Sequence, residues 1–296
     1  MNTSQTWTTE RENRNLGTLR RLVEDVHNHG RTELIPSYYA DGLVEHDPRV
    51  GTGAGEFWRE FRGLFSGLRV TVGHCLADDD HVMAFLTWTG ALREDDSREL
   101  MLYTSELFRL HEDKVVEHGA VVDYCELAEF GLTPRRSGHP SSARLRGPHL
   151  PEEEANARVV LAAYDEVMTR HRLDRADDFY EKDYAHHNFQ MPAVAGGIDA
   201  FKEYFAGNFA RYPDLSVTVD HILARGDRVM VFATWRGTFT GRTQGRAPTG
   251  RRLRMRTSDL FRLADRKVVE HWEVVDYAGL QRVGIPIRPA RHLPRP

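Results

Sequence analysis

The sequence predicts an α+β fold built from two tandem domains, and three observations support this prediction. The chain has 296 residues, which is enough for two domains of ordinary size with separate cores. The stretch Lys114–Tyr124, KVVEHGAVVDY, recurs almost unchanged as Lys267–Tyr277, KVVEHWEVVDY. In each half a helix-rich part precedes four predicted strands, so we expect a curved antiparallel sheet with helices on its concave face.

Composition and charge exclude several classes of protein. Hydrophobic residues make up 40% of the chain and charged residues 28%, and the net charge of -4 offers no basic field for nucleic acid. No apolar run approaches the roughly 18 residues of a membrane span, and the N-terminal stretch lacks the apolar core of a signal peptide. The two cysteines, Cys75 and Cys125, do not suggest a disulfide framework. We therefore expect a cytoplasmic protein that binds neither nucleic acid nor a membrane.

The first domain is predicted to span residues 12–132 and to begin with a helix near residues 15–29. Leu19, Val23 and Val26 recur in this stretch at spacings of three and four, which gives one apolar stripe along a helix. Four later stretches are rich in apolar and β-branched residues, as strands are. The elements expected after the first helix are, in order, a helix over 32–39, a loop with His46 and Asp47, a helix over 54–65, and strands over 69–76, 81–91, 99–110 and 114–122.

A linker is predicted over residues 133–151, because this stretch is rich in Pro, Ser, Gly and Arg and has no apolar period. The second domain then spans residues 152–286 and repeats the plan of the first. Tyr180–Asn188 aligns with Tyr39–Asp47 without a gap. The same order of elements is therefore expected in both domains.

The repeated stretch Lys267–Tyr277 is predicted to be a strand, since its valines favour a pleated backbone and no Gly or Pro interrupts it. Side chains alternate between the two faces of a strand. We expect the face with a tryptophan and two carboxylates to line a pocket that can handle protons, and the other face to lie on the convex side of the sheet. The pocket face is Glu270, Trp272, Val274 and Asp276, and the convex face is His271, Glu273, Val275 and Tyr277.

Several short motifs follow one another in the second half, namely His187-Asn188, Phe201, Pro213-Asp214-Leu215, Gly226-Asp227-Arg228-Val229, Gly237-Thr238, Pro248-Thr249-Gly250, Phe261-Arg262 and Lys267–Asp276. This series resembles the SnoaL-like polyketide cyclases. Their cone-shaped fold is shared with ketosteroid isomerase, scytalone dehydratase, limonene epoxide hydrolase and nuclear transport factor two. The resemblance covers residues 155–285 and, more loosely, 12–132, and it implies two tandem cone-shaped domains.

The resemblance also implies a reaction. Characterised members of the family close rings by aldol-type chemistry without a metal or an organic cofactor, and an acidic residue near the end of the last strand moves protons at the carbon next to a carbonyl. The matching residues here are Asp276 and its copy Asp123. Burial of Asp276 against Trp and Val should raise its pKa toward the range of a general acid or base. The alternative is that an Asp at the end of a strand caps the following turn.

Other candidate residues have two interpretations each. His187 and its counterpart His46 lie in predicted loops, where they either donate a hydrogen bond to a developing oxyanion or fasten the loop. Asp259, replaced by Glu106 in the first half, is in phase with Phe261 and is either a second proton carrier or a buried partner for Arg or Tyr. The candidate substrate contacts are Trp272, Trp235, Trp88, Arg256 and Tyr103.

No metal site is expected from the spacing of the histidines and cysteines. The adjacent His186 and His187 would point apart as strand neighbours, and the sequence has no His-x-x-x-His and no Cys pair at ligand spacing. We therefore expect neither a metal nor another cofactor.

The two halves are not equivalent. The first half has Gly119 where the second has Trp272, and Ala120 where it has Glu273, and it lacks the insert 241–251. We expect the second half to be the working site and the first to be a structural partner or a differently shaped pocket. In the resembling fold the convex face commonly makes the dimer contact, so the halves are expected to form an internal pseudo-dimer that can oligomerise further.

The leading interpretation is a cofactor-free acid/base enzyme of secondary metabolism that acts as an aldol-type cyclase on a hydrophobic, carbonyl-bearing small molecule. Two alternatives remain open. One is epoxide opening, which needs two acids and an arginine in one pocket, and the candidates for it are Asp259, Asp276 and either Arg254 or Arg256. The other is a non-catalytic ligand-binding or assembly protein, which exposure of Asp276 to bulk water would favour.

Overall fold

The structure, a computed structural model, describes residues 8–47, 54–128, 130, 132, 143–188, 196–242 and 247–285. Residues 133–142 of the predicted linker, 243–246 of the insert and 286 of the second domain lie outside this part of the chain. The described residues form two compact domains. The first comprises those of Trp7–Pro140 with Arg146–Pro148, and the second those of Ser141–Leu145 and His149–Pro289. None of the described helices is long and apolar enough to cross a membrane.

The first domain begins with helices and continues with a sheet. Its elements are α1 (Glu10–Leu22), a π-helical turn (Val23–Asn28), a 3-10 turn (Thr32–Leu34), α2 (Ile35–Tyr38), β1 (Tyr39–Glu45), α3 (Ala54–Leu64), β2 (Phe65–Asp78), β3 (His81–Leu92), β4 (Asp95–His111), β5 (Lys114–Val122) and α4 (Tyr124–Ala128).

The second domain repeats this order. Its elements are α5 (Pro151–Ala163), a π-helical turn (Tyr164–Thr169), a 3-10 turn (Leu173–Arg175), α6 (Ala176–Phe179), β6 (Tyr180–His187), α7 (Gly197–Arg211), β7 (Ser216–Arg225), β8 (Arg228–Thr238), β9 (Arg252–Ala264), β10 (Lys267–Val275) and α8 (Ala278–Arg282).

Each domain contains an open sheet of five strands. The strand orders are β1-β5-β4-β3-β2 and β6-β10-β9-β8-β7. The four predicted strands of each half are antiparallel neighbours, as expected. Each sheet is mixed, because β1 and β6 add a fifth, parallel strand beside β5 and β10 that the predicted antiparallel sheet did not include. The predicted loop position of His187 was wrong for the same reason, since His187 ends β6. His46 and Asp47 lie in the loop that directly follows β1, as predicted.

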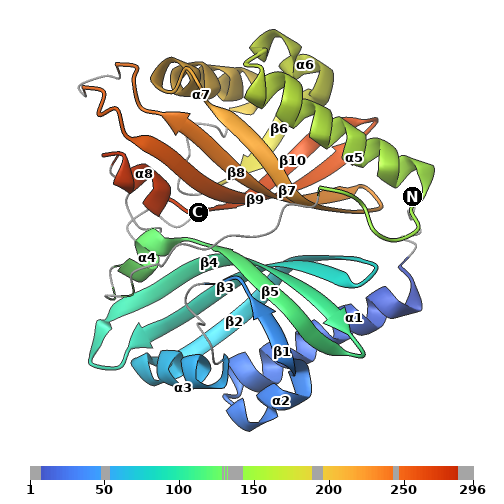
Figure 1. The fold of residues 1–296 in the computed structure, drawn as a ribbon, viewed down its shortest axis with the longest axis vertical. Coiled ribbons are helices and arrows are strands. Elements are labelled where there is room, and N and C mark those ends of the chain that lie inside the picture. The colour runs from blue at the N-terminus through green and yellow to red at the C-terminus, as the bar shows by residue number, and fades with distance from the viewer. Residues whose placement is uncertain are drawn as a thin grey trace. The chain divides into compact units, whose positions relative to one another are not determined.

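The helices α1, α2 and α3 cover one face of the first sheet, and α5, α6 and α7 cover one face of the second (Figure 1). Between each sheet and its helices lies a core of fully buried aliphatic side chains, such as Leu22 and Val26 in the first domain and Val167 in the second. These observations confirm the predicted α+β class in both halves.

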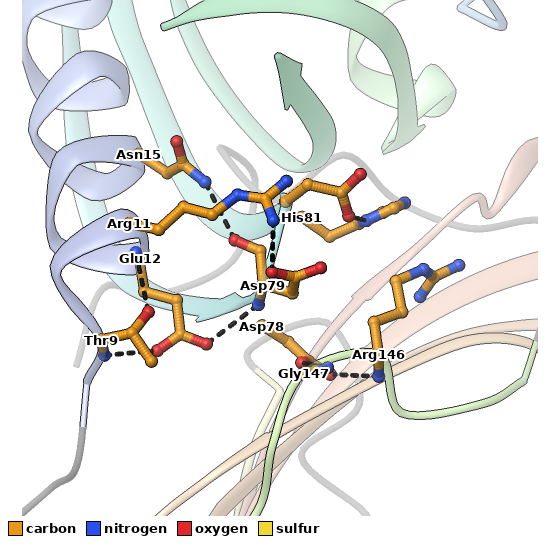
Figure 2. A network of polar contacts seen from close by, with 10 residues as sticks. Thr9, Arg11, Glu12, Asn15, Asp78, Asp79, His81, Arg146 and Gly147 are labelled. Carbon is orange, nitrogen blue, oxygen red and sulfur yellow. Dashed lines mark hydrogen bonds and ion pairs between the residues drawn. The ribbon is translucent and has the colours of Figure 1, made fainter. Parts of the chain in front are cut away.

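The first helix of the first domain is fixed to a hairpin turn by polar side chains (Figure 2). Thr9 and Glu12 form a capping box at the start of α1, which satisfies backbone N–H groups of the first turn. Glu12 also accepts a hydrogen bond from the backbone N–H of Asp79 at 2.9 Å, and Asn15 donates to the Asp79 carbonyl at 3.0 Å. The carboxylate of Asp78 accepts the backbone N–H of Gly147 at 2.8 Å.

The second domain repeats this anchor. Glu153 accepts the backbone N–H of Gly226 at 2.8 Å, and Asn156 donates to the Gly226 carbonyl at 3.1 Å. Gly197 sets the start of α7, because its φ is 74° and a Cβ there would lie 2.7 Å from the carbonyl oxygen of Lys182. Glycine therefore lets α7 approach β6 closely, and this approach closes one side of the interior.

Candidate active site

The second domain contains a partly open cavity of about 150 Å³. Its wall combines aromatic, aliphatic and polar side chains. The aromatic lining is Tyr164, Tyr180, Phe201, Tyr204, Phe205, Tyr212, Trp235 and Phe261. The polar lining is His186, Asn208, Arg211, Thr257, Asp259, His271 and Glu273.

The face of β10 that lines the cavity is opposite to the predicted one. His271, Glu273 and Val275 line the cavity, whereas Trp272 and Asp276 are outside its lining. The physical cause is a β-bulge near the start of the strand. Val268 pairs with Leu263, but Glu270 pairs with Arg262, so one extra residue is inserted in β10 and the register shifts.

Asp259 is buried in the interior, as predicted. The register shift in β10 decides which side chains of that strand share a face with Asp259. In an antiparallel pair, directly opposed residues point to the same side of the sheet. With the bulge, Asp259 opposes Glu273, and Phe261 opposes His271. Without it, Asp259 would oppose Trp272, which is the arrangement that simple alternation along the sequence predicts.

Asp259 is the centre of a buried hydrogen-bond network on β9. Its Oδ1 accepts a hydrogen bond from Nε2 of His271 at 2.9 Å. Its Oδ2 accepts hydrogen bonds from the Tyr164 hydroxyl at 2.8 Å and from the Thr257 hydroxyl at 2.7 Å. Trp235 donates to Thr257 at 3.1 Å. With three donors on its two oxygens, the carboxylate fixes one tautomer of His271 and leaves Nδ1 of that ring as the proton acceptor.

Tyr164 reaches Asp259 from the point at which α5 becomes π-helical. The first domain has the apolar Val23 at the equivalent point of its own π-helical turn. Such widened turns often occur at functional sites. Burial and the neighbouring Asp259 raise the pKa of Tyr164 well above its usual value, so its hydroxyl remains a donor.

A second pair lies beside the first, formed by His186 at the end of β6 and Glu273. Nε2 of His186 lies 3.1 Å from the Glu273 carboxylate, and the side chains are 6% and 11% exposed. Asn188 donates a hydrogen bond to Glu273 and another to the Tyr277 hydroxyl. The two histidine rings stack in parallel, with centroids 4.4 Å apart and an interplanar angle of 1°.

The electrostatics separate the roles of the two pairs. Burial lowers the pKa of His271, and the charge of His186 lowers it further, so His271 is neutral near neutral pH. Burial opposes ionisation of Glu273, but His186, His271 and Asn188 outweigh it and lower the pKa of Glu273 to about 2. The cavity therefore holds a neutral imidazole beside an ionised carboxylate, an arrangement that suits proton transfer.

The same three residues can be considered as metal ligands. His186, His271 and Glu273 offer ligand atoms within 4.8 Å of one another. However, a metal ion lies close to the plane of any imidazole that binds it, and the two parallel ring planes share no such point. One ring would have to turn before both could bind one ion.

Several predicted site residues lie away from the cavity lining. The Asp276 carboxylate accepts the backbone N–H of Ala278 at 3.2 Å and lies 3.7 Å from Arg282. Burial raises the pKa of Asp276 to about 6, against the charges of Arg282 and Arg256. Its copy Asp123 accepts the backbone N–H of Cys125 at 3.1 Å. Both carboxylates thus make the cap contact that was the alternative interpretation, and Asp276 was wrongly placed in the pocket.

Trp272 was also wrongly placed in the pocket, and His187, the expected oxyanion donor, is outside the cavity lining as well. They stack on each other, with centroids 4.7 Å apart, and neither lines the cavity. Arg256 is buried on β9 but does not line the cavity, so the two acids and the arginine required for epoxide opening do not meet there. Among the predicted substrate contacts of the second domain, Trp235 is the one that lines the cavity.

The first domain has a related polar cluster in its interior. His118, at the position of His271, hydrogen-bonds to Glu106 at 2.8 Å and to Glu45 at 2.9 Å. Burial lowers the pKa of His118, but the charge of Glu45 and the hydrogen bonds of both carboxylates outweigh it and raise the pKa to about 10. Trp88 stacks on Trp58 at 5.3 Å and 4° in the interior.

The remaining predicted residues of the first domain are structural neighbours of this cluster. His46 lies 2.9 Å from the Glu117 carboxylate, and the backbone carbonyl of Tyr103 accepts the N–H of Asp123 at 3.2 Å. Ala120 occupies the position of Glu273 and has no carboxylate to offer. His118 is therefore held in its charged form and cannot act as a base at neutral pH.

These features place the chain among tandem α+β proteins, with a cavity in the second domain. The sequence profile of the family described as SnoaL-like polyketide cyclase matches residues 17–129 and 158–283. The chain therefore belongs to the SnoaL-like polyketide cyclase family, with one matching segment in each half. No match was found among curated proteins.

Solved structures of similar proteins each match about half of the chain. A candidate SnoaL-like polyketide cyclase from Jannaschia sp. CCS1 is 26% identical and covers 48% of this chain and 100% of its own, with a TM-score of 0.42. AclR from Streptomyces galilaeus, described as a candidate hydroxylase, is 27% identical and covers 45% and 99%, with a TM-score of 0.40. IdmH from Streptomyces antibioticus, described as a candidate polyketide cyclase, is 23% identical and covers 44% and 99%, with a TM-score of 0.40.

Proposed function

We propose that the second domain is a cofactor-free acid/base enzyme that closes a ring in an apolar, carbonyl-bearing small molecule by an aldol-type reaction. The observation that carries the proposal is the pair of stacked histidines in an aromatic cavity, each beside its own carboxylate. Membership of the SnoaL-like polyketide cyclase family supports a cyclase-type role.

His271 is the proposed general base. Its Nε2–H is held by Asp259, so the lone pair of Nδ1 is free to accept a proton from the carbon next to a substrate carbonyl. Asp259 then stabilises the imidazolium that forms, as the carboxylate of a catalytic triad does. The lowered pKa of His271 keeps the ring unprotonated before the reaction.

His186 is the proposed electrophilic partner. Neither of its ring nitrogens makes a hydrogen bond within the described residues, although Nε2 forms an ion pair with Glu273. A substrate oxygen that gains negative charge would accept a hydrogen bond from this ring. Glu273, which Asn188 holds in place and whose pKa is lowered to about 2, is the ionised carboxylate beside His186.

The proposed reaction balances without an oxidant or a cofactor. His271 removes a proton from the carbon, and the resulting enolate attacks a second carbonyl of the same molecule to form a carbon–carbon bond. The alkoxide that results takes the proton back from the His271 imidazolium. The aromatic walls, among them Phe205 and Trp235, exclude water and hold a flat substrate in place.

The test is proton exchange on a simple ketone of suitable shape. We expect the protein to accelerate the exchange of the methyl protons of 2-acetylnaphthalene for deuterium in heavy water, measured by proton NMR. His271→Gln and Asp259→Asn should lower the rate about 10²–10⁴-fold, which is the usual contribution of a positioned base.

His187→Gln is the matched control for His186→Gln, because the two residues are adjacent but only His186 lines the cavity. The His187 variant should keep the wild-type rate and the His186 variant should not. Equal losses in both, or full activity in His271→Gln, would contradict the proposal. Absence of any exchange above background would favour the non-catalytic binding alternative.

A further inference from the structure

The α7 side of the cavity holds a positive charge that the proposed chemistry does not use. Arg211, the last residue of α7, is the one Lys or Arg side chain in the lining. Its Nη1 donates to the Asn208 side chain at 3.3 Å, and within the described residues it forms no ion pair with a carboxylate. Both lining carboxylates are already engaged, Asp259 with His271 and Glu273 with His186.

Two polar atoms at this end are buried without a hydrogen-bond partner in the described structure. They are Nε of Arg211 and the hydroxyl of Tyr212, a side chain that is 1% exposed. Burial raises the pKa of the Tyr212 hydroxyl and the charge of Arg211 opposes this rise, which indicates that the two groups lie close together. Buried donors without acceptors destabilise a protein, so such groups need an explanation.

The position of Arg211 at a helix C-terminus explains its charge only in part. A cation in the last turn interacts favourably with the helix dipole. That interaction leaves Nε and the tyrosine hydroxyl without acceptors, and it does not require the side chain to line an aromatic cavity. A ligand with an anionic group supplies both the missing acceptors and the missing counter-charge.

We infer that the second-domain cavity selects aromatic ligands that carry a carboxylate, with the carboxylate bound by Arg211 and Tyr212. This inference rests on the proposed function, since it takes the same cavity as the working site and names the class of its substrate. The planar guanidinium presents paired N–H donors that match the two oxygens of a carboxylate. The carboxylate end then lies at α7, and the reacting carbonyl faces the histidines that project from β6 and β10.

The test is a pair of probes of nearly the same shape, 2-naphthoate and the neutral 2-naphthamide, titrated into the full chain by calorimetry at pH 7. Wild type should bind the acid more tightly than the amide by about 10–100-fold, the usual effect of hydrogen bonds to a charged group. Arg211→Gln should remove this preference while affinity for the amide stays within about two-fold. Tyr212→Phe should reduce the preference by a smaller factor, because the charge remains.

Arg236→Gln is the control for net charge, because Arg236 is exposed and its hydrogen bond among the described residues is to the Thr218 hydroxyl at 3.4 Å. This variant should retain the full preference for the acid. Equal affinity of wild type for the two probes, no binding of the acid, or an unchanged preference in Arg211→Gln would overturn the inference. Circular dichroism of each variant establishes that it is folded before titration.

The experiment separates this inference from the proposed reaction. Titration needs no turnover, so His271→Gln should keep the preference for the acid even though it loses proton exchange. A preference for the acid without any proton exchange in wild type would support anion recognition and reject the proposed chemistry. Proton exchange without a preference for the acid would support the proposed chemistry and reject anion recognition by Arg211 and Tyr212.

Discussion

Substitution of His118 tests whether the first domain depends on its buried charge cluster. His118→Gln removes a protonated ring from between Glu45 and Glu106, and all three side chains are less than 9% exposed. Removal of one partner from a buried ion pair costs about 3–5 kcal/mol, because the remaining charges are left uncompensated. For a domain of this size that loss lowers the melting temperature by about 10–20 °C.

The effect has a defined pH dependence. The pKa of His118 is about 10 in the folded domain and about 6.5 in the unfolded chain. Because the folded value is higher, the stabilisation is fully present below pH 6.5 and is lost as the pH rises toward 10. The difference in stability between wild type and the variant should therefore be largest near pH 6 and shrink on the alkaline side.

The assay is thermal unfolding followed by circular dichroism, because the stacked Trp58 and Trp88 give a signal that belongs to the first domain. His46→Gln is the control, since its pair with Glu117 is partly exposed and should contribute less than about 1 kcal/mol. A His118 variant as stable as the His46 variant, or a difference that grows above pH 7, would refute this reasoning.

Three further predictions concern the second domain. The unfolding free energy of wild type should fall by up to about 3 kcal/mol between pH 4 and pH 6, because the pKa of Asp276 is raised to about 6 in the folded protein. In urea titrations of Asp276→Asn this fall should be absent, and a fall that persists in the variant would assign it to another group. Tyr164→Phe should lower the unfolding free energy by about 1–2 kcal/mol through the lost 2.8 Å bond to Asp259, with an unchanged denaturation midpoint as the contradicting result. Treatment with EDTA should leave proton exchange unaltered, whereas a loss restored by a divalent metal would show that His186, His271 and Glu273 bind an ion.

Much of the fold could be predicted because the repeat is visible in the sequence and periodicity specifies helices and strands. The missed elements were β1 and β6, whose mixed polar composition gives no alternation of the usual kind. The residues Asp259 and Trp235 could be placed inside from their phase within β9 and β8.

The positions of His271 and Glu273 in the site could not be predicted, because they depend on the register between β9 and β10 and not on the amino-acid composition of β10. Both faces of β10 carry valines and acids, so the pattern does not specify which face is buried. The bulge that decides it is set by pairing with β9. A signal was nevertheless present, since the acid of known phase, Asp259, needed a buried donor and His271 was available to provide it.

The same bulge occurs in both domains. In the first, Leu110 pairs with Val115 while Arg109 pairs with Glu117, so Val116 is the extra residue that corresponds to Val269. Deletion of either valine would shift the register of the rest of its strand by one residue, so that the buried and outward-facing side chains of that strand exchange faces. Selection on this stretch therefore acts on its length as well as on its chemistry. Single-residue deletions here should be purged even though the deleted side chain performs no reaction.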